Sequence, residues 1–318
     1  MRIRASRRST VALAAAATLA STGSAYVGAR TFLSGQAEAA RRVIPKSWDI
    51  PPRADGVYPP GAQPVERWHR GVSFDLHLMV FGDSTATGYG ARSADEVPGV
   101  IIARNLAEAS GKRIRLSTKA IVGATSKGLS GQIDAMFVAG PPPDAAVIMI
   151  GANDITRLHG IGPSARRLGA AVRRLRASGA VVVVGTCPDF GVITAIPQPL
   201  RTVARTRGLR LARAQAAAVR TSGGVPVPLA DLLSPDFKQA PELFFSEDMF
   251  HPSGAGYALA AKQLLPALCN ALGDFATATE PESPLETRVP DANTLLSRLG
   301  SVSRLWRRST GVPAPIVA

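Results

Sequence analysis

The sequence predicts an α/β fold in which helices cover both faces of a parallel sheet. Short apolar runs stand at 76–81, 144–151 and 180–186, and helix-patterned segments alternate with them. The runs are nearly continuous in apolar residues, which is typical of parallel strands that are buried on both faces. Because ligands of such sheets bind beyond the carboxyl ends of the strands, the residues after each strand are the first candidates for a site.

The N-terminal segment has the pattern of an export signal. A cationic stretch, MRIRASRR, precedes the uncharged residues 9–29, whose apolar centre is VALAAAATLA. Cleavage could follow either STGSA or residues 37–39, and the uncharged stretch also has the length of about 20 residues that a retained anchor needs. Arg7 and Arg8 partly resemble a twin-arginine signal, so both export routes stay open. We predict a signal peptide or N-terminal membrane anchor over 1–39, and an exported protein that is secreted or associated with the cell envelope.

Three further segments follow along the chain. Residues 40–73 are rich in proline and turn formers and predict a spacer or a wrapped arm. The alternating strand and helix patterns fill residues 74–273, which we expect to form the one folded domain. Residues 274–318 predict a flexible basic tail.

The charge of the chain excludes one class of partner. Its 37 basic and 23 acidic residues give a net charge of +14, but aromatic residues do not interleave with the basic ones as a base-stacking surface requires. We therefore expect no nucleic-acid binding, and we expect peripheral contact with an anionic membrane or the cell wall. Pairing of Cys187 with Cys269 stays open in an exported protein. No cluster has metal-ligand spacing, so neither a metal nor a cofactor is expected.

The segment VFGDSTATGYGA, residues 80–91, follows the first strand of the domain. Its glycine spacing fits neither a P-loop nor a dinucleotide fingerprint. Two other strand ends carry Gly123 and the sequence Gly151-Ala-Asn153-Asp154, and Asp248 stands three residues before His251 ahead of the last helix. An α/β-hydrolase elbow fits less well, because that fold places several strands before its nucleophile.

These residues supply what acyl transfer requires. Ser84 needs a base to take its proton, and His251 can act as that base if Asp248 fixes its tautomer. The N–H groups of Ser84 and Gly123 and the side-chain amide of Asn153 can stabilise an oxyanion. We expect the remaining acidic side chains of these motifs, Asp83 and Asp154, to hold their own loops. His159 is the rival candidate for the base.

The four blocks, in order, resemble those of the SGNH/GDSL hydrolase superfamily, and the resemblance is greatest to its exported actinobacterial branch. The resemblance implies a three-layer α/β/α sandwich with a flavodoxin-like, five-stranded parallel sheet. It assigns Ser84 as nucleophile, His251 as base and Asp248 as its partner, and it assigns the oxyanion hole to Ser84, Gly123 and Asn153. Thr85-Ala86 stands where many members have Leu-Thr, which bears on substrate preference rather than on mechanism.

The expected function is that of an exported serine esterase. It would hydrolyse carboxylic esters of a lipid, or of an acylated small molecule or carbohydrate, through an acyl-enzyme intermediate. Two alternatives stay open, namely an acyltransferase acting on a cell-envelope acceptor and a non-catalytic envelope-binding protein on the same fold. We expect a monomer.

Overall fold

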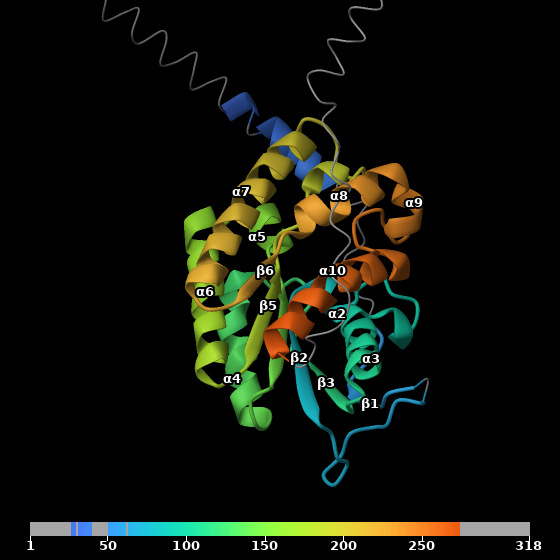
Figure 1. Cartoon of the computed structure of the whole chain (residues 1–318). Coiled ribbons are helices and arrows are strands. Elements are labelled where there is room, and N and C mark those ends of the chain that lie inside the picture. Colours follow the sequence, from blue (N-terminus) through green and yellow to red (C-terminus); the bar gives the residue numbers. More distant parts are fainter. Residues whose placement is uncertain (1–26, 30, 40–49, 62, 274–318) are drawn as a thin grey trace, which may run out of the picture. The chain divides into compact units, whose positions relative to one another are not determined.

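The computed structural model describes residues 27–29, 31–39, 50–61 and 63–273 of the chain. Its centre is a six-stranded sheet of order β1-β3-β2-β4-β5-β6, drawn in Figure 1. The strands are β1 (Gly56–Tyr58), β2 (Leu76–Gly82), β3 (Ile114–Thr118), β4 (Ala145–Met149), β5 (Val181–Gly185) and β6 (Val225–Val227). β2 to β6 pair in parallel, in the order of a flavodoxin-like sheet, and β1 pairs antiparallel with β3. The expected five-stranded parallel sheet is confirmed and carries one further strand.

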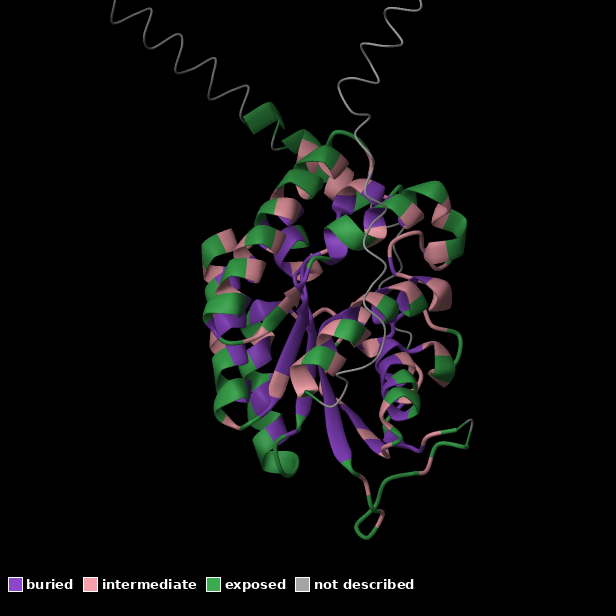
Figure 2. Cartoon of the chain, in the orientation of Figure 1, coloured by how far each residue is buried: buried purple, intermediate pink, exposed green. Residues whose placement is uncertain are grey.

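Helices cover the two faces of the sheet and make the three-layer sandwich. One face carries α3 (Pro98–Ser110) and α10 (Gly254–Leu272), and the other carries α4 (Leu129–Ala139), α6 (Ile161–Ala177) and α7 (Leu200–Thr221). Successive residues of β2 point to opposite faces, so that Leu78 packs in the first layer of core and Met79 in the second. Figure 2 shows the central strands of the sheet buried between these helices, and every residue of β2 and β4 is buried.

The helices form where the sequence pattern places them. In α6, Leu168, Val172 and Leu175 are buried, and the arginines at 173, 174 and 176 are exposed. This is the apolar face and solvated cationic face that the sequence predicts. Helix α3 has Pro98 in its first turn and ends at Gly111, which takes the left-handed conformation that favours glycine at a helix end.

Short helices gather in the connections that follow the strands. They are α2 (Ser84–Thr87), α5 (Ala152–Thr156), α8 (Leu229–Gln239) and α9 (Pro241–Phe244), with the 3₁₀ turns η1 (Ala94–Glu96), η2 (Ser126–Gly128) and η3 (Phe190–Val192). A third apolar cluster joins η3 to α8 through Phe190 and Phe237. Because α2 follows β2, and β2 lies between β3 and β4, Ser84 stands where the strand order reverses, the usual ligand position in such sheets.

The arm contributes the sixth strand, which the sequence analysis did not predict. β1 has only three residues in a segment rich in proline, so no strand pattern is visible there. Val57 also forms a bridge with Glu66, whose carboxylate pairs with Arg113 beside β3. The arm thereby covers the edge of β3, which would otherwise expose unpaired backbone groups.

Several expectations about the ends of the chain fall outside the described residues. These include the apolar centre of the N-terminal segment and the tail over 274–318, whereas residues 27–29 and 31–39 are helical. No helix in the described ranges is both long and apolar enough to cross a bilayer. Cys187 and Cys269 are both free thiols.

Candidate active site

Ser84 lies on a tight turn between β2 and α2. Gly82 has a φ of 138°, and a Cβ there would stand 1.9 Å from the carbonyl oxygen of Met149, so only glycine fits. The Asp83 carboxylate caps α2 by accepting the Thr85 N–H at 3.0 Å. Ser84 is the first residue of α2 and keeps only 6 % of its surface exposed. The turn therefore presents the Ser84 hydroxyl in a fixed position.

The Gln132 side chain, which the sequence analysis did not select, also holds this turn. Gln132 of α4 accepts the Gly82 N–H at 2.9 Å and donates to the Gly82 carbonyl at 2.8 Å. Both bonds are buried, and they satisfy the N–H and the carbonyl of Gly82 at the last position of β2, which is in register with Met149 of β4. No motif marks Gln132, because its role depends on where α4 packs.

His251 and Asp248 meet on a short loop before α10. The Asp248 Oδ2 lies 2.6 Å from His251 Nδ1, while its Oδ1 accepts the backbone N–H groups of Phe250 and His251. Met249 between them has a φ of 52°, a conformation that closes the loop enough for the contact. His251 Nε2 lies 3.1 Å from Ser84 Oγ. The structure thus brings together Ser84, Asp248 and His251, which the sequence analysis proposed as nucleophile, partner carboxylate and base.

The two nearby carboxyl groups have pKa values that move in opposite directions. Burial raises the pKa of Asp248, but hydrogen bonds from the His251 ring and from the Phe250 and His251 amides outweigh burial and bring it down to about 2. Burial raises the pKa of Asp83 to about 6, and bonds from Thr85 and Gly151 offset only part of the effect. Asp248 is consequently the carboxylate that stays ionised beside the imidazole.

Asp83 also joins two strands. Its Oδ1 accepts both the backbone N–H and the hydroxyl of Thr85, and its Oδ2 accepts the Gly151 N–H at 3.3 Å. Gly151 follows β4, so Asp83 holds the end of β2 against the end of β4. It holds a neighbouring loop as well as its own, and it makes no hydrogen bond to His251.

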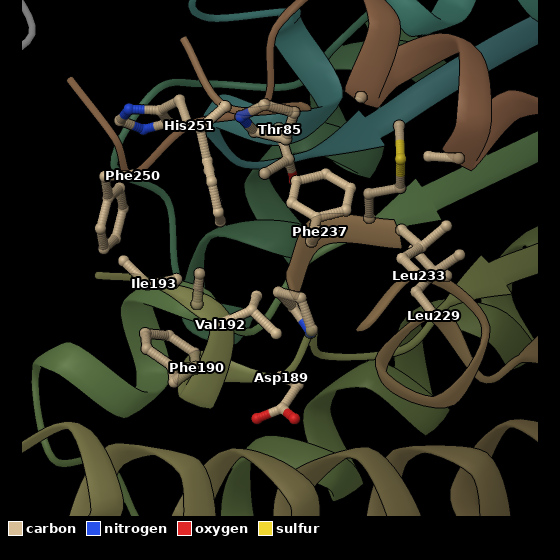
Figure 3. Close-up of a pocket in the computed structure, with 18 of the residues that line it drawn as sticks. Thr85, Asp189, Phe190, Val192, Ile193, Leu229, Leu233, Phe237, Phe250 and His251 are labelled. Carbon is tan, nitrogen blue, oxygen red and sulfur yellow. The ribbon is translucent and has the colours of Figure 1, made fainter. Parts of the chain in front are cut away.

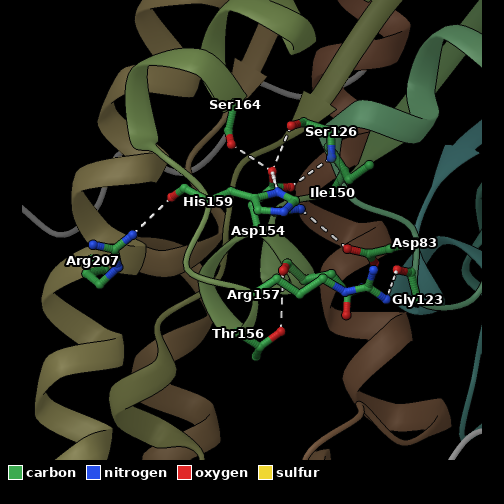
Figure 4. Close-up of polar contacts among 12 residues, drawn as sticks. Asp83, Gly123, Ser126, Ile150, Asp154, Thr156, Arg157, His159, Ser164 and Arg207 are labelled. Carbon is green, nitrogen blue, oxygen red and sulfur yellow. Dashed lines mark hydrogen bonds and ion pairs between the residues drawn. The ribbon is translucent and has the colours of Figure 1, made fainter. Parts of the chain in front are cut away.

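Gly123 lies on the loop before η2 and Asn153 lies in the short helix α5, and a buried cluster of hydrogen bonds around Asp154, here called the clasp, joins these two segments. Asp154 accepts hydrogen bonds from the Ser126 N–H at 2.8 Å and from the hydroxyls of Ser126 and Ser164, both at 2.7 Å. Figure 4 shows this cluster and the Arg157 side chain, which donates to the Gly123 carbonyl at 3.1 Å. Asp154 therefore holds more than its own loop, because Ser126 belongs to the Gly123 loop.

The donors expected of an oxyanion site are available. Among the described residues, the Gly123 N–H and the Asn153 side-chain amide have no hydrogen-bond acceptor. Gly123 has a φ of 78°, which glycine adopts without strain. The Ile121 N–H bonds the Gly82 carbonyl at 3.1 Å and ties the Gly123 loop to the end of β2. The loops that carry all three expected donors are thus joined to one another by hydrogen bonds.

His159 is not placed to act as the base for Ser84. Its Nδ1 lies 3.2 Å from Asp154 Oδ1, and its carbonyl accepts a hydrogen bond from Arg207. Figure 4 shows it on the far side of Asp154 from Asp83. His159 belongs to the clasp, which leaves His251 as the imidazole that contacts Ser84.

An apolar cavity opens beside Ser84 and His251. Figure 3 shows its walls, where η3 supplies Phe190 and Val192 and α8 supplies Leu233 and Phe237. Phe250 packs its ring edge-on against His251, with 5.0 Å between ring centroids. Among the described residues that line this cavity, none is a lysine or an arginine. In the part of the chain that the structure describes, no group of three or more His, Cys, Asp or Glu side chains could hold a metal ion.

Comparison with known proteins shows which family the chain belongs to. The model of the GDSL-like lipase/acylhydrolase family matches residues 80–259, which include Ser84 and His251. The chain belongs to this family. It is also 67 % identical over 301 residues to a GDSL-like esterase of Mycobacterium tuberculosis strain H37Rv, and the match covers 95 % of this chain and 96 % of that protein. The chain is therefore an esterase of the GDSL type.

Solved structures of lower identity also match. The psychrotrophic esterase EstA from Pseudoalteromonas sp. is 18 % identical with a TM-score of 0.49, and the match covers 63 % of this chain and all of that one. A lipase/acylhydrolase from Enterococcus faecalis is 20 % identical with a TM-score of 0.48, and the match covers 65 % of this chain and all of that one.

The GDSL-type site contains residues that lie outside the motif blocks. Gln132, Ser126 and Ser164 make buried hydrogen bonds to Gly82 or Asp154, yet none stands in a recognisable pattern. Thr85, which departs from the usual leucine, donates its hydroxyl to Asp83 at 2.8 Å and lines the apolar cavity. A leucine could not make that hydrogen bond, so the departure changes both the Asp83 environment and the cavity wall.

Proposed function

We propose that this esterase is exported and that it hydrolyses carboxylic esters through an acyl-enzyme formed on Ser84. The proposal rests on two hydrogen-bond contacts beside an apolar cavity. Asp248 Oδ2 lies 2.6 Å from His251 Nδ1, and His251 Nε2 lies 3.1 Å from Ser84 Oγ. A serine hydroxyl, an imidazole and a carboxylate in such a row form the arrangement that activates a serine nucleophile.

In the first half of the reaction, Ser84 Oγ attacks the carbonyl carbon of the ester while its proton passes to His251 Nε2. The ionised Asp248 accepts the His251 Nδ1–H and stabilises the imidazolium that forms. The tetrahedral oxyanion takes hydrogen bonds from the N–H groups of Ser84 and Gly123 and from the Asn153 amide. As the intermediate collapses, the carbon–oxygen bond to the alcohol breaks, and the alcohol leaves with the proton from His251.

In the second half, water replaces the alcohol. His251 takes a proton from water, the hydroxide attacks the Ser84 acyl ester, and the second tetrahedral intermediate releases the carboxylic acid as Ser84 Oγ recovers its proton. The same donors stabilise both intermediates. The clasp made by Asp154 supports the reaction by holding the Gly123 loop against helix α5, which carries Asn153, and Asp154 is therefore a positioning residue.

The apolar cavity is proposed to take the acyl group of the ester. Its walls are aliphatic and aromatic, and burying an acyl chain there removes apolar surface from water. The alcohol part then faces outward, where the exposed side chains of Ile121, Leu158 and Arg157 stand on the two clasped loops. The substrate class that fits is an ester with an apolar acyl group.

Export rests on the N-terminal sequence pattern alone. Residues 1–8 are cationic and residues 9–29 uncharged, as in a signal peptide or anchor. Fractionation of cells that express the full chain should recover the protein outside the cytoplasm, and deletion of residues 1–26 should retain it inside. Recovery of the full chain in the cytoplasmic fraction would contradict export without affecting the catalytic proposal.

The esterase activity is tested with p-nitrophenyl esters whose acyl groups run from acetate to palmitate. We expect hydrolysis of at least part of the series by the wild type and none above background by Ser84→Ala. The matched control is Ser130→Ala, which removes a hydroxyl exposed on α4 and should retain full activity. Full activity of Ser84→Ala would show that another residue is the nucleophile.

A further inference from the structure

A second cavity lies between the arm and strand β3. Its volume is about 680 Å³, and it is open to solvent. The arm contributes one wall with Arg53, Asp55, Arg67 and Trp68, and β3 with the residue after it contributes the other with Arg115 and Lys119. The proposed reaction uses none of these residues.

The cavity has an excess of positive charge that the protein does not neutralise. Among the described residues that line it, four side chains are cationic, at positions 53, 67, 115 and 119, and one is a carboxylate, that of Asp55. Within the described ranges, none of the four forms an ion pair. Asp55 itself is engaged, because it accepts the Thr118 N–H at 2.8 Å. The balance of four cations to one anion makes this a cavity that attracts anions.

Aromatic rings pack against the guanidinium of Arg115. Its guanidinium carbon lies 3.6 Å from the centroid of the Trp68 ring, and the Phe74 ring stands 5.3 Å away. Stacking of this kind fixes the plane of the guanidinium and leaves its N–H groups to point outward in that plane. The Arg115 side chain makes no hydrogen bond to any described residue, and its Nε is buried without an acceptor. A part-buried guanidinium with free donors is suited to an oxyanion ligand.

The wall around Arg115 is fixed by neighbouring groups. Ser117, two residues along β3 and on the same side of the strand, lies 2.9 Å from His77 Nε2. Burial lowers the pKa of His77 to about 4, with Arg115 as a second cause, so this imidazole adds no charge near neutral pH. Arg115 is therefore carried by a strand whose neighbouring side chains are fixed by hydrogen bonds.

The cavity also approaches the catalytic turn. Thr87, which lines the cavity, belongs to the same short helix as Ser84, and the Lys119 N–H donates to the Val80 carbonyl at 2.8 Å.

We propose that this cavity binds a phosphate group, with Arg115 and Lys119 as its principal ligands. Several cations against one carboxylate favour a dianionic phosphate over a singly charged carboxylate. The phosphate could belong to the alcohol part of an ester substrate or to a separate ligand.

Binding is tested by calorimetric titration of the full-length protein with inorganic phosphate at low ionic strength. We expect saturable binding by the wild type that weakens as salt is added. Arg115→Gln should weaken binding by about 10-fold or more, since it removes charge-assisted hydrogen bonds, and Lys119→Gln should weaken it less. The matched control is Arg174→Gln, which lowers the net charge equally but lies on α6 and pairs with Asp134.

Two results would overturn the phosphate site. One is the absence of saturable binding by the wild type, and the other is equal binding by the wild type and by both cavity variants. The thermal unfolding midpoint of each variant checks that it is folded. Because Arg115→Gln also removes the stacking on Trp68, Lys119→Gln provides the independent test if Arg115→Gln is unfolded.

A second experiment distinguishes the two sources of the phosphate. This experiment rests on the proposed esterase function. Two esters with the same acyl group, with and without a phosphate on the alcohol, are compared. A lower KM for the phosphorylated ester in the wild type, lost in Lys119→Gln, assigns the phosphate to the substrate. Equal KM values assign it to a separate ligand. Hydrolysis of neither ester, with phosphate binding retained, would contradict the proposed function alone.

Discussion

Asp83 and Asp248 are two carboxyl groups near the same serine, and the protein shifts their pKa values in opposite directions. Asp83 is fully buried, and burial raises its pKa to about 6. Asp248 is also buried against its loop, but the His251 ring and two amides outweigh that burial and lower its pKa to about 2. The difference lies in the hydrogen bonds, because the His251 ring donates directly to Asp248, whereas its charge acts on Asp83 without a hydrogen bond.

The comparison separates an acidic residue in the reaction from an acidic residue in the framework. Asp248 is placed to fix the tautomer of His251 and to balance its positive charge. Asp83 joins the ends of β2 and β4 through Gly151 and Thr85. Replacing each carboxylate by its amide should therefore have effects of different kinds.

The largest expected effect is that of Asp248→Asn. The amide cannot hold the Nδ1–H tautomer of His251, so kcat should fall by about 10³- to 10⁴-fold while KM changes little. Steady-state kinetics on a p-nitrophenyl ester measures both constants. A fall of less than about tenfold would place Asp248 outside the reaction.

Asn153→Ala should have the next largest effect. Loss of one preorganised oxyanion donor lowers kcat by about 10²- to 10³-fold. The matched control is Thr156→Ala, an exposed position on the same short helix. Equal, small effects of both substitutions would show that the Asn153 amide does not contact the oxyanion.

Asp83→Asn should change stability rather than chemistry. The folded-state pKa of Asp83, about 6, lies above the unfolded value of 3.8, so the folded protein holds the proton more tightly. Asp83 therefore makes wild-type stability fall as pH rises from about 4 to about 6, by up to about 3 kcal/mol. Asp83→Asn should remove this fall, as urea unfolding across that pH range would show.

The same variant sharpens the kinetic side of the comparison. Because Asp83 makes no hydrogen bond to His251, Asp83→Asn should lower kcat/KM near neutral pH far less than Asp248→Asn does. An equally large fall in Asp83→Asn, with the variant folded, would mean that Asp83 takes part in the reaction. In that case the two carboxylates would share the reaction.

The smallest expected effect concerns Thr85. Its hydroxyl bond lowers the pKa of Asp83, so Thr85→Val, which keeps the backbone N–H bond, should raise that pKa above about 6. The change is measured by following the Asp83 carboxyl carbon in an NMR titration. An unchanged pKa would show that the hydroxyl does not contribute to the Asp83 environment.

The sequence predicts the sheet and the motif residues because these follow local rules. Continuous apolar runs mark β2, β4 and β5, and the GDSL blocks stand at strand ends where parallel sheets place their ligands. Strand β1 escapes prediction because its pairing depends on β3, which is distant in sequence, rather than on its own composition.

The clasp escapes prediction for a related physical reason. Ser126 and Ser164 belong to separate segments, and only the packing of α6 against η2 brings both hydroxyls to Asp154. Gln132 likewise reaches Gly82 from α4 across the core. A polar residue that serves a distant backbone group leaves no periodic signal, whereas Asp248 and His251 are recognisable because they are three residues apart.

The central claim is that Ser84 is a nucleophile activated by His251. It is tested most directly by reaction with a fluorophosphonate followed by peptide mass spectrometry. We predict one covalent adduct, on the peptide that contains Ser84 in the wild type, no adduct in Ser84→Ala, and much slower labelling in His251→Gln. An adduct on another serine, or equally fast labelling in His251→Gln, would contradict the account.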